Sequence, residues 1–147
     1  MEKELRMQKG GSGRTLRAEL SPELDKLTGG IIGAAIEVHR TLGPGFLESL
    51  YAEALALALD QTAIPFAREL RVGVSFHGRP IGEHRLDLLV ADRVVVELKA
   101  VETLARIHYA QVRSYLRATD LRVGLLLNFE SPTLEVRRIL NPDGRGG

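Results

Sequence analysis

The chain of 147 residues contains no cysteine, which excludes both disulfide bonds and thiolate zinc sites. The absence suits a reducing compartment, and we expect a cytoplasmic protein. No apolar run approaches the length of about 18 residues that a membrane-spanning helix needs. The N-terminus, MEKELRMQKG, is charged throughout and lacks the apolar core of a signal peptide. We therefore expect no membrane partner.

A large excess of one charge is also missing. The chain has 20 basic and 19 acidic residues, for a net charge of +1. A surface that is basic all over, as in many nucleic-acid-binding proteins, is thereby excluded, so phosphate binding must depend on local patches or on a metal ion. Hydrophobic residues make up 44% and charged residues 27%, as is typical of a soluble globular domain.

The sequence predicts one folded domain between two short terminal segments. Residues 1–20 contain KGGSGR and little periodic apolar content, which indicates a flexible N-terminal arm. Residues 21–140 form the domain, and NPDGRGG at 141–147 is a C-terminal tail.

Within this domain, helical and strand patterns follow in the order α-α-β-β-β-α-β, with a candidate final strand. The predicted elements are a helix that begins at Ser21 and Pro22 and ends at TLGPG (41–45), a helix from Phe46 to about Asp60, two strands within 66–90 separated by a turn at His77–Pro80, a strand VVVELKAV, a helix at roughly 103–119, a buried strand RVGLLLNF, and the final strand TLEVRRIL.

Three charged residues interrupt an otherwise apolar strand pair, RLDLLVADRVVVELKAV at 85–101. They are Asp87, Glu97 and Lys99, and such side chains are normally depleted from buried strands. Because side chains alternate across a strand, Glu97 and Lys99 share one face. The bland interpretation is a solvated face with the glutamate and lysine at an exposed edge.

The turn length decides whether the two acids meet. Asp87 lies opposite Glu97 only if Val90 faces Val94 across a three-residue turn, Ala91-Asp92-Arg93. A two-residue turn would place the two carboxylates on opposite faces of the hairpin. We predict the three-residue turn.

Two converging carboxylates repel each other unless a cation lies between them. Magnesium commonly binds one or two carboxylates together with water and substrate phosphates. A lysine two residues beyond the glutamate can neutralise charge on a phosphate or hold a water molecule, while the metal activates water near neutral pH. This combination indicates a phosphodiester hydrolase.

The helix after these strands has three different faces. The 3.6-residue period predicts a core stripe of Ala105, Tyr109, Val112 and Leu116. A polar flank, expected over the Glu-x-Lys strand, consists of His108, Gln111 and Tyr115. A basic flank consists of Arg106, Arg113 and Arg117. The basic flank is either a solvated surface or a contact to nucleic-acid backbone.

These motifs together resemble a known group of enzymes. D87…E97-x-K99 followed by Q111-x-x-x-Y115 resembles the PD-(D/E)XK nuclease superfamily, and the Gln-x-x-x-Tyr part resembles its RecB-like branch. The stretch GFLESLY (45–51) resembles the signature of the GxxExxY family within it. The resemblance covers about residues 24–140 and implies an α/β fold: a restriction-endonuclease-like αβββαβ core with a mixed central sheet flanked by helices. Leu86 stands where the superfamily often has proline.

The resemblance also implies a metal site, with Mg²⁺ or Mn²⁺ as cofactor. Asp87 and Glu97 would be metal ligands, together with the main-chain carbonyl group of Leu98. Glu48 resembles the extra acidic residue that an earlier helix brings to the metal in many members. Lys99 would orient or activate the attacking water.

Two further residues would orient substrate or carboxylate by hydrogen bonds, Gln111 and Tyr115, unless they only cap a buried polar network. Tyr51 is as well explained by packing in the core as by catalysis. The expected partner is nucleic acid, DNA rather than RNA. A catalytically silent module that binds nucleic acid or a protein, and an RNA-directed nuclease, remain alternatives. A domain this small is also expected to form a homodimer or to use a protein partner.

Overall fold

A computed structural model of the protein describes residues 20–145. The predicted N-terminal arm lies outside the described residues except for Leu20, and so do the last two residues of the predicted tail. The elements are α2 (Pro22–Leu42), α3 (Glu48–Gln61), β1 (Phe66–Phe76), β2 (Arg79–Val90), β3 (Val94–Lys99), α4 (Arg106–Thr119), β4 (Val123–Asn128) and β5 (Glu135–Leu140). Their order confirms the predicted one, including the candidate final strand.

Local sequence signals set the ends of the first helix. The side chain of Ser21 accepts a hydrogen bond from the N–H group of Leu24 at 3.1 Å, and proline occupies the first turn. The helix ends where Gly43 adopts a φ of 68°, a conformation that favours glycine. α3 begins at Glu48, later than the predicted Phe46, because Leu47 is still extended.

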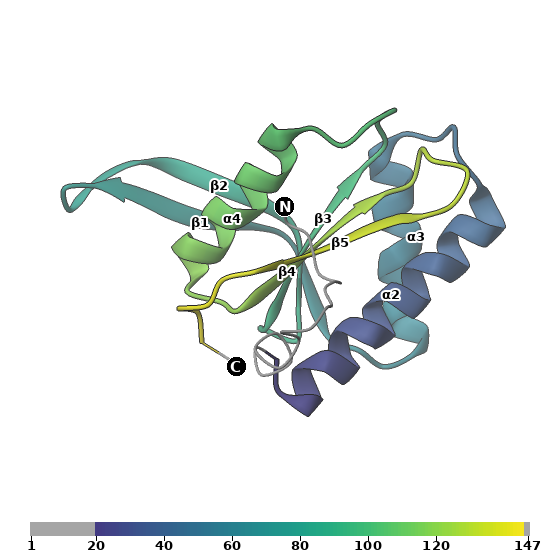
Figure 1. Ribbon diagram of the computed structural model, residues 1–147, viewed down its shortest axis with the longest axis horizontal. Coiled ribbons are helices and arrows are strands. Elements are labelled where there is room, and N and C mark those ends of the chain that lie inside the picture. The colour runs from purple at the N-terminus through teal and green to yellow at the C-terminus, as the bar shows by residue number, and fades with distance from the viewer. Residues whose placement is uncertain (1–19, 146–147) are drawn as a thin grey trace, which may run out of the picture.

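Five strands form one mixed sheet in the order β1-β2-β3-β4-β5 (Figure 1). All neighbours are antiparallel except β3 and β4, which are parallel and connected through α4. The turn between β1 and β2 consists of His77 and Gly78, so the predicted turn at His77–Pro80 was too long and Pro80 lies within β2. Because both turn residues have positive φ values, the turn matches the right-handed twist of the strands.

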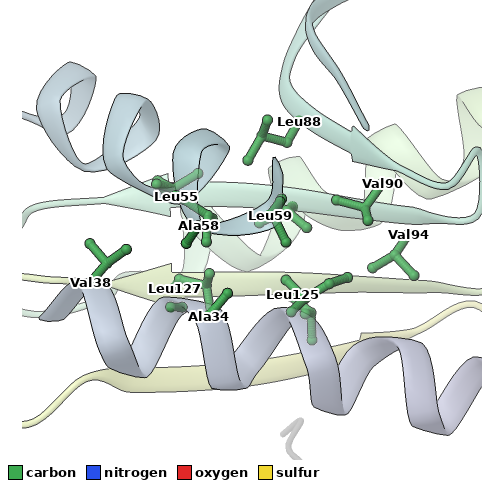
Figure 2. Packing of buried hydrophobic residues seen from close by; sticks show 14 of the residues in the cluster. Ala34, Val38, Leu55, Ala58, Leu59, Leu88, Val90, Val94, Leu125 and Leu127 are labelled. Carbon is green, nitrogen blue, oxygen red and sulfur yellow. The ribbon is translucent and has the colours of Figure 1, made fainter. Parts of the chain in front are cut away.

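Helices cover both faces of the sheet. α2 and α3 pack on one face, where the larger core lies, and Figure 2 shows side chains of both helices meeting those of the central strands. α4 covers the other face with a smaller core that includes Val95, Val112, Leu116 and Leu126. β3 and β4 are therefore buried on both sides, which explains their nearly continuous apolar sequences.

The position of α4 differs from the prediction in two respects. The helix begins at Arg106, and Ala105, predicted in the core stripe, is an exposed residue that precedes it. Tyr115, predicted on a flank, is buried. The reason is tertiary: Leu70 and Val72 of β1 pack against the same core as α4, so they cover one flank of the helix as well as its central stripe.

Among residues 20–145, no helix is long and apolar enough to cross a membrane.

Candidate active site

The strand register brings the two acids of the hairpin together. Val90 pairs with Val94 across the turn Ala91-Asp92-Arg93, as predicted, and the first two turn residues have φ values of 54° and 56°. Continued by one more position, this register places Asp87 opposite Glu97. The three-residue turn is confirmed.

At this point the two carboxylates replace main-chain bonds between β2 and β3. The N–H group of Leu98 donates to Oδ2 of Asp87 at 2.9 Å, and the N–H group of Asp87 donates to Oε2 of Glu97 at 3.0 Å. The N–H and C=O groups of one strand residue face the same neighbouring strand. The carbonyl group of Leu98 therefore faces the opening between β2 and β3.

The opening exists because β2 leaves β3 here and continues alongside β1. Glu69 of β1 has a φ of 50°, which is unusual for a residue other than glycine, and it is not paired in the β1–β2 ladder. Past this irregularity Leu86 packs on the α4 side of the sheet, whereas Leu88 packs on the side of α2 and α3. The acids thus lie at a fork between diverging strands, visible in Figure 1 as the departure of the β1–β2 hairpin.

Burial raises the pKa of both acids. Glu97 is only 4% exposed, and burial, followed by the negative charge of Asp87, raises its pKa from 4.5 to about 8. Burial also raises the pKa of Asp87, although hydrogen bonds from Leu98 and Glu97 oppose this rise. The positive charge of Lys99 acts in the same opposing direction on both acids. The site therefore favours an added positive charge.

Lys99 is held at the end of β3 by the parallel pairing with β4. The register partner of Lys99 is Asn128, which is fully buried. The carbonyl oxygen of Lys99 accepts the N–H group of Phe129 at 2.9 Å. The Asn128 amide accepts the N–H group of Val101 at 3.0 Å and donates to the Val101 carbonyl oxygen at 2.8 Å. Sequence reasoning did not single out Asn128, which fixes the chain just beyond Lys99.

Glu48, at the start of α3, reaches the same end of β3. Its Oε2 accepts the N–H group of Ala100 at 3.1 Å, and its charge contributes to the raised pKa of Asp87, after burial as the main cause. The charge of Glu48 thus acts on Asp87, although no group of three acids that could hold a metal is found among the described residues.

The other two members of the GxxExxY sequence build the loop that carries Glu48. Tyr51 is fully buried and stacks on Phe129 at 4.6 Å, while its hydroxyl group donates to the carbonyl oxygen of Gly43 at 2.6 Å. Gly45 has a φ of 110°, and its N–H group donates to Glu130 at 3.3 Å. These contacts agree with the packing interpretation of Tyr51.

α4 brings a polar flank over the fork. Burial, followed by the negative charges of Glu97 and Asp87, raises the pKa of Tyr115 to about 12, so both charges act on its hydroxyl group. Gln111 is half-buried one turn earlier on the same side of the helix.

His108, one turn before Gln111, was left without a role by the sequence. Burial, followed by the charge of Lys99, lowers its pKa, and the charge of Glu48 opposes this effect. Its Nδ1 accepts the N–H group of Ala105 at 2.9 Å, so a neutral ring carries its proton on Nε2. Its spacing from Gln111 and Tyr115 placed His108 on this flank of the helix, although the sequence assigned it no part in the site.

The donor set fits a hard divalent cation. Magnesium takes oxygen ligands and commonly uses one or two carboxylates, with water and phosphate oxygens completing its shell. Asp87 and Glu97 supply two carboxylates, and the carbonyl oxygen of Leu98 faces the same opening. Across the part of the chain that the structure describes, no group of three acidic or histidine side chains could hold a metal ion by itself. A metal here would thus depend on the carbonyl group, water or substrate for further ligands.

A mixed sheet covered by helices, with a carboxylate pair and a lysine where two strands diverge, is the arrangement of a nuclease-type α/β domain. The sequence model of the PD-(D/E)XK nuclease superfamily matches residues 25–139. The chain belongs to this superfamily.

Two other comparisons add less. No curated protein sequence matches the chain. Among solved structures, the crystal structure of a protein named SSO0001 is similar with a TM-score of 0.52 and 17% sequence identity, over 64% of this chain and 50% of that one. The chain thus corresponds to about half the length of that protein, and the likeness concerns the fold alone.

Proposed function

We propose that this protein is a metal-dependent nuclease that hydrolyses phosphodiester bonds, with DNA as its substrate. The observation that carries the proposal is the direct contact of Asp87 and Glu97 at the fork between β2 and β3, with Lys99 on the same strand as Glu97. Membership of the nuclease superfamily supports it.

Mg²⁺ or Mn²⁺ would be held by Asp87, Glu97 and the carbonyl oxygen of Leu98, with Glu48 at the edge of the site. When bound, the ion would supply activated water and stabilise negative charge on the phosphate group. The raised pKa values of both acids support this assignment, because a bound cation would favour the ionised forms that burial, and for Glu97 also the charge of Asp87, disfavour.

The side chains around the pair would act on the substrate. The ammonium group of Lys99 would neutralise charge on the phosphate or hold the attacking water. Gln111, Tyr115 and His108 would donate hydrogen bonds to phosphate oxygens or to a carboxylate. The effects of the Glu97 and Asp87 charges on Tyr115, and of the Lys99 and Glu48 charges on His108, support this role, and Gln111 lies on the same flank of α4 by its spacing.

Within the superfamily, we assign the chain to the GxxExxY family, on the basis of Gly45, Glu48 and Tyr51. The Gln111-x-x-x-Tyr115 spacing supports a relation to the RecB-like branch. A cytoplasmic location, as expected for a chain without cysteine, is part of the same proposal.

The rival function is a nuclease fold that binds nucleic acid without cleaving it. The observation in its favour is that, among residues 20–145, no three side chains form a metal cluster by themselves. Against it, all the acidic, lysine and glutamine residues of the superfamily motif are present.

Lys99→Ala separates the two functions. A charge directed at the reacting group contributes most when charge changes in the transition state, so we expect cleavage of a DNA substrate with Mg²⁺ to fall about 100-fold or more. Binding of the same DNA, measured with EDTA present, should change little, because one phosphate contact contributes a small part of the affinity. Lys26→Ala is the matched control, since Lys26 is exposed on α2.

Two outcomes would contradict the nuclease assignment. One is the absence of any metal-dependent cleavage of DNA or RNA by the unmodified protein. The other is equal cleavage by the unmodified protein and Lys99→Ala, together with weaker binding by the variant. Cleavage of RNA but not DNA would keep the mechanism and change the substrate.

A further inference from the structure

The β1–β2 hairpin extends well beyond the sheet as a two-stranded arm. Figure 1 shows it projecting past α4, away from α2 and α3. β2 runs from Arg79 at the tip of this arm to Asp87 at the fork, a length of about 26 Å at a rise of about 3.3 Å per residue. This is most of one turn of a nucleic-acid duplex, which measures about 34 Å.

The two faces of the arm differ in character. Leu70, Val72 and Leu86 face α4 and belong to its core, and the ring of His84 packs on Tyr115 at 4.5 Å. Because side chains alternate along each strand, Arg71 and Arg85 lie on the opposite face.

On that outer face, Arg71 and Arg85 occupy directly paired positions. Like charges directly opposite each other destabilise a strand pair. Glu83 approaches Arg71 at 3.7 Å, but both side chains are largely exposed, so this ion pair compensates only weakly. The face therefore suits an anionic partner.

The tip of the arm carries apolar surface in contact with solvent. Phe76 is 61% exposed and Ile81 is 66% exposed. The ring of Phe76 stacks on His77 at 4.1 Å, and Arg79 is its partner in the strand register. Exposed aromatic and apolar side chains beside an arginine are suited to contacts with nucleic-acid bases and grooves.

We propose that the β1–β2 arm binds double-stranded nucleic acid by entering a groove of the duplex, which can admit a two-stranded ribbon. Arg71 and Arg85, on the outer face, contact phosphates, and Phe76, which alternation places on the opposite face at the tip, contacts the bases. The inference deepens the proposed function and rests on it for the identity of the substrate. The arm is continuous with β2, so a duplex held along it would be fixed relative to Asp87.

A second copy of the chain fits the arm less well. A stable protein interface buries about 800 Å² on each partner, and the apolar tip offers two side chains. A two-fold interface between outer faces would also bring Arg71 and Arg85 of one copy against the same residues of the other. Nucleic acid brings the opposite charge.

The test measures binding by fluorescence anisotropy, using the full chain, EDTA to prevent cleavage, and short labelled duplexes of DNA and of RNA in parallel. For Arg71→Gln combined with Arg85→Gln, we expect weaker binding and a shallower dependence of log affinity on log salt, by about 2 in slope. For Phe76→Ala, we expect affinity to fall about 10-fold with the slope unchanged. Arg40→Gln and Leu57→Ala are matched controls, because Arg40 on α2 and Leu57 on α3 are also exposed.

Several results would overturn the proposal. The first is that the unmodified protein binds neither duplex at low salt. The second is that both arm variants keep the affinity of the unmodified protein. The third is that the arm substitutions convert a dimer to a monomer in sedimentation without loss of affinity per protomer. The two proposals fail separately. Arm-dependent binding without cleavage removes the nuclease and keeps the arm, whereas cleavage with arm-independent binding removes the arm alone. The relative loss on DNA and RNA shows which duplex the arm prefers.

Discussion

Glu97→Gln should make the protein more stable in alkaline solution without metal, although it removes a proposed metal ligand. The glutamine has nearly the same shape, and its oxygen can still accept the N–H group of Asp87, which donates to Glu97 at 3.0 Å. What the change removes is a negative charge that is 4% exposed and lies against a second carboxylate. Such a charge is costly to bury.

The magnitude follows from the pKa of Glu97, which burial and then the charge of Asp87 raise from 4.5 to about 8. Between these values the folded protein keeps a proton that the unfolded chain has released. The free energy of unfolding therefore falls as the pH rises from about 4.5 to about 8, and this effect is constant above that range. The full rise in the pKa of Glu97 corresponds to a loss of at most about 5 kcal/mol in the free energy of unfolding. Because the site relaxes and admits water, we expect about 2 kcal/mol.

Urea unfolding of both proteins at about pH 5 and about pH 9, with EDTA present, measures the effect. Relative to the unmodified protein, Glu97→Gln should gain about 2 kcal/mol at the higher pH and little at the lower pH. Adding Mg²⁺ at the higher pH should stabilise the unmodified protein more than the variant, because a ligand that binds only the folded state shifts the equilibrium. Glu37→Gln, on the exposed side of α2, is the control. A variant that is less stable than the unmodified protein at about pH 9 would refute the reasoning.

Two further substitutions test the packing that holds the site. Gly124→Ala should cost about 1–3 kcal/mol in urea unfolding, because its Cβ would lie 2.7 Å from Val112 of α4. Gly33→Ala, in α2 with open space around it, should instead gain about 0.5–1 kcal/mol. Tyr51→Phe should cost about 1–3 kcal/mol in thermal or urea unfolding, because it removes the 2.6 Å hydrogen bond to the Gly43 carbonyl oxygen. An unchanged stability in Gly124→Ala or Tyr51→Phe would contradict the corresponding contact.

The sequence alone was sufficient for most local features, although the starts of α3 and α4 and the length of the β1–β2 turn differed from the prediction. Helix ends follow from Ser21 and Gly43, and strands follow from alternation and apolar runs. The pairing of Asp87 with Glu97 followed from the odd number of residues in the Ala91–Arg93 turn. A turn shorter by one residue would move every side chain of one strand to the other face.

Contacts between distant parts of the chain were decided by the tertiary structure. Glu48 reaches Ala100 across 52 residues of sequence, and no local pattern predicts that contact. The burial of Tyr115 depends on β1 covering a flank of α4, which the periodicity of the helix cannot reveal.

The fork itself is also a tertiary feature. The sequence predicts a simple hairpin at 85–101, but β2 leaves β3 at Asp87 and follows β1, with Glu69 in an unusual conformation at the same level. Because of this departure, the Leu98 N–H group donates to the Asp87 carboxylate and not to a main-chain carbonyl group of β2. Periodicity and turn length thus determined which residues face each other, because these depend on neighbours along the chain. The opening between β2 and β3, where Asp87 and Glu97 lie, was decided by the packing of three strands and three helices. It depends on whether β2 forms its main-chain hydrogen bonds with β1 or with β3, and neighbours along the chain do not determine that choice.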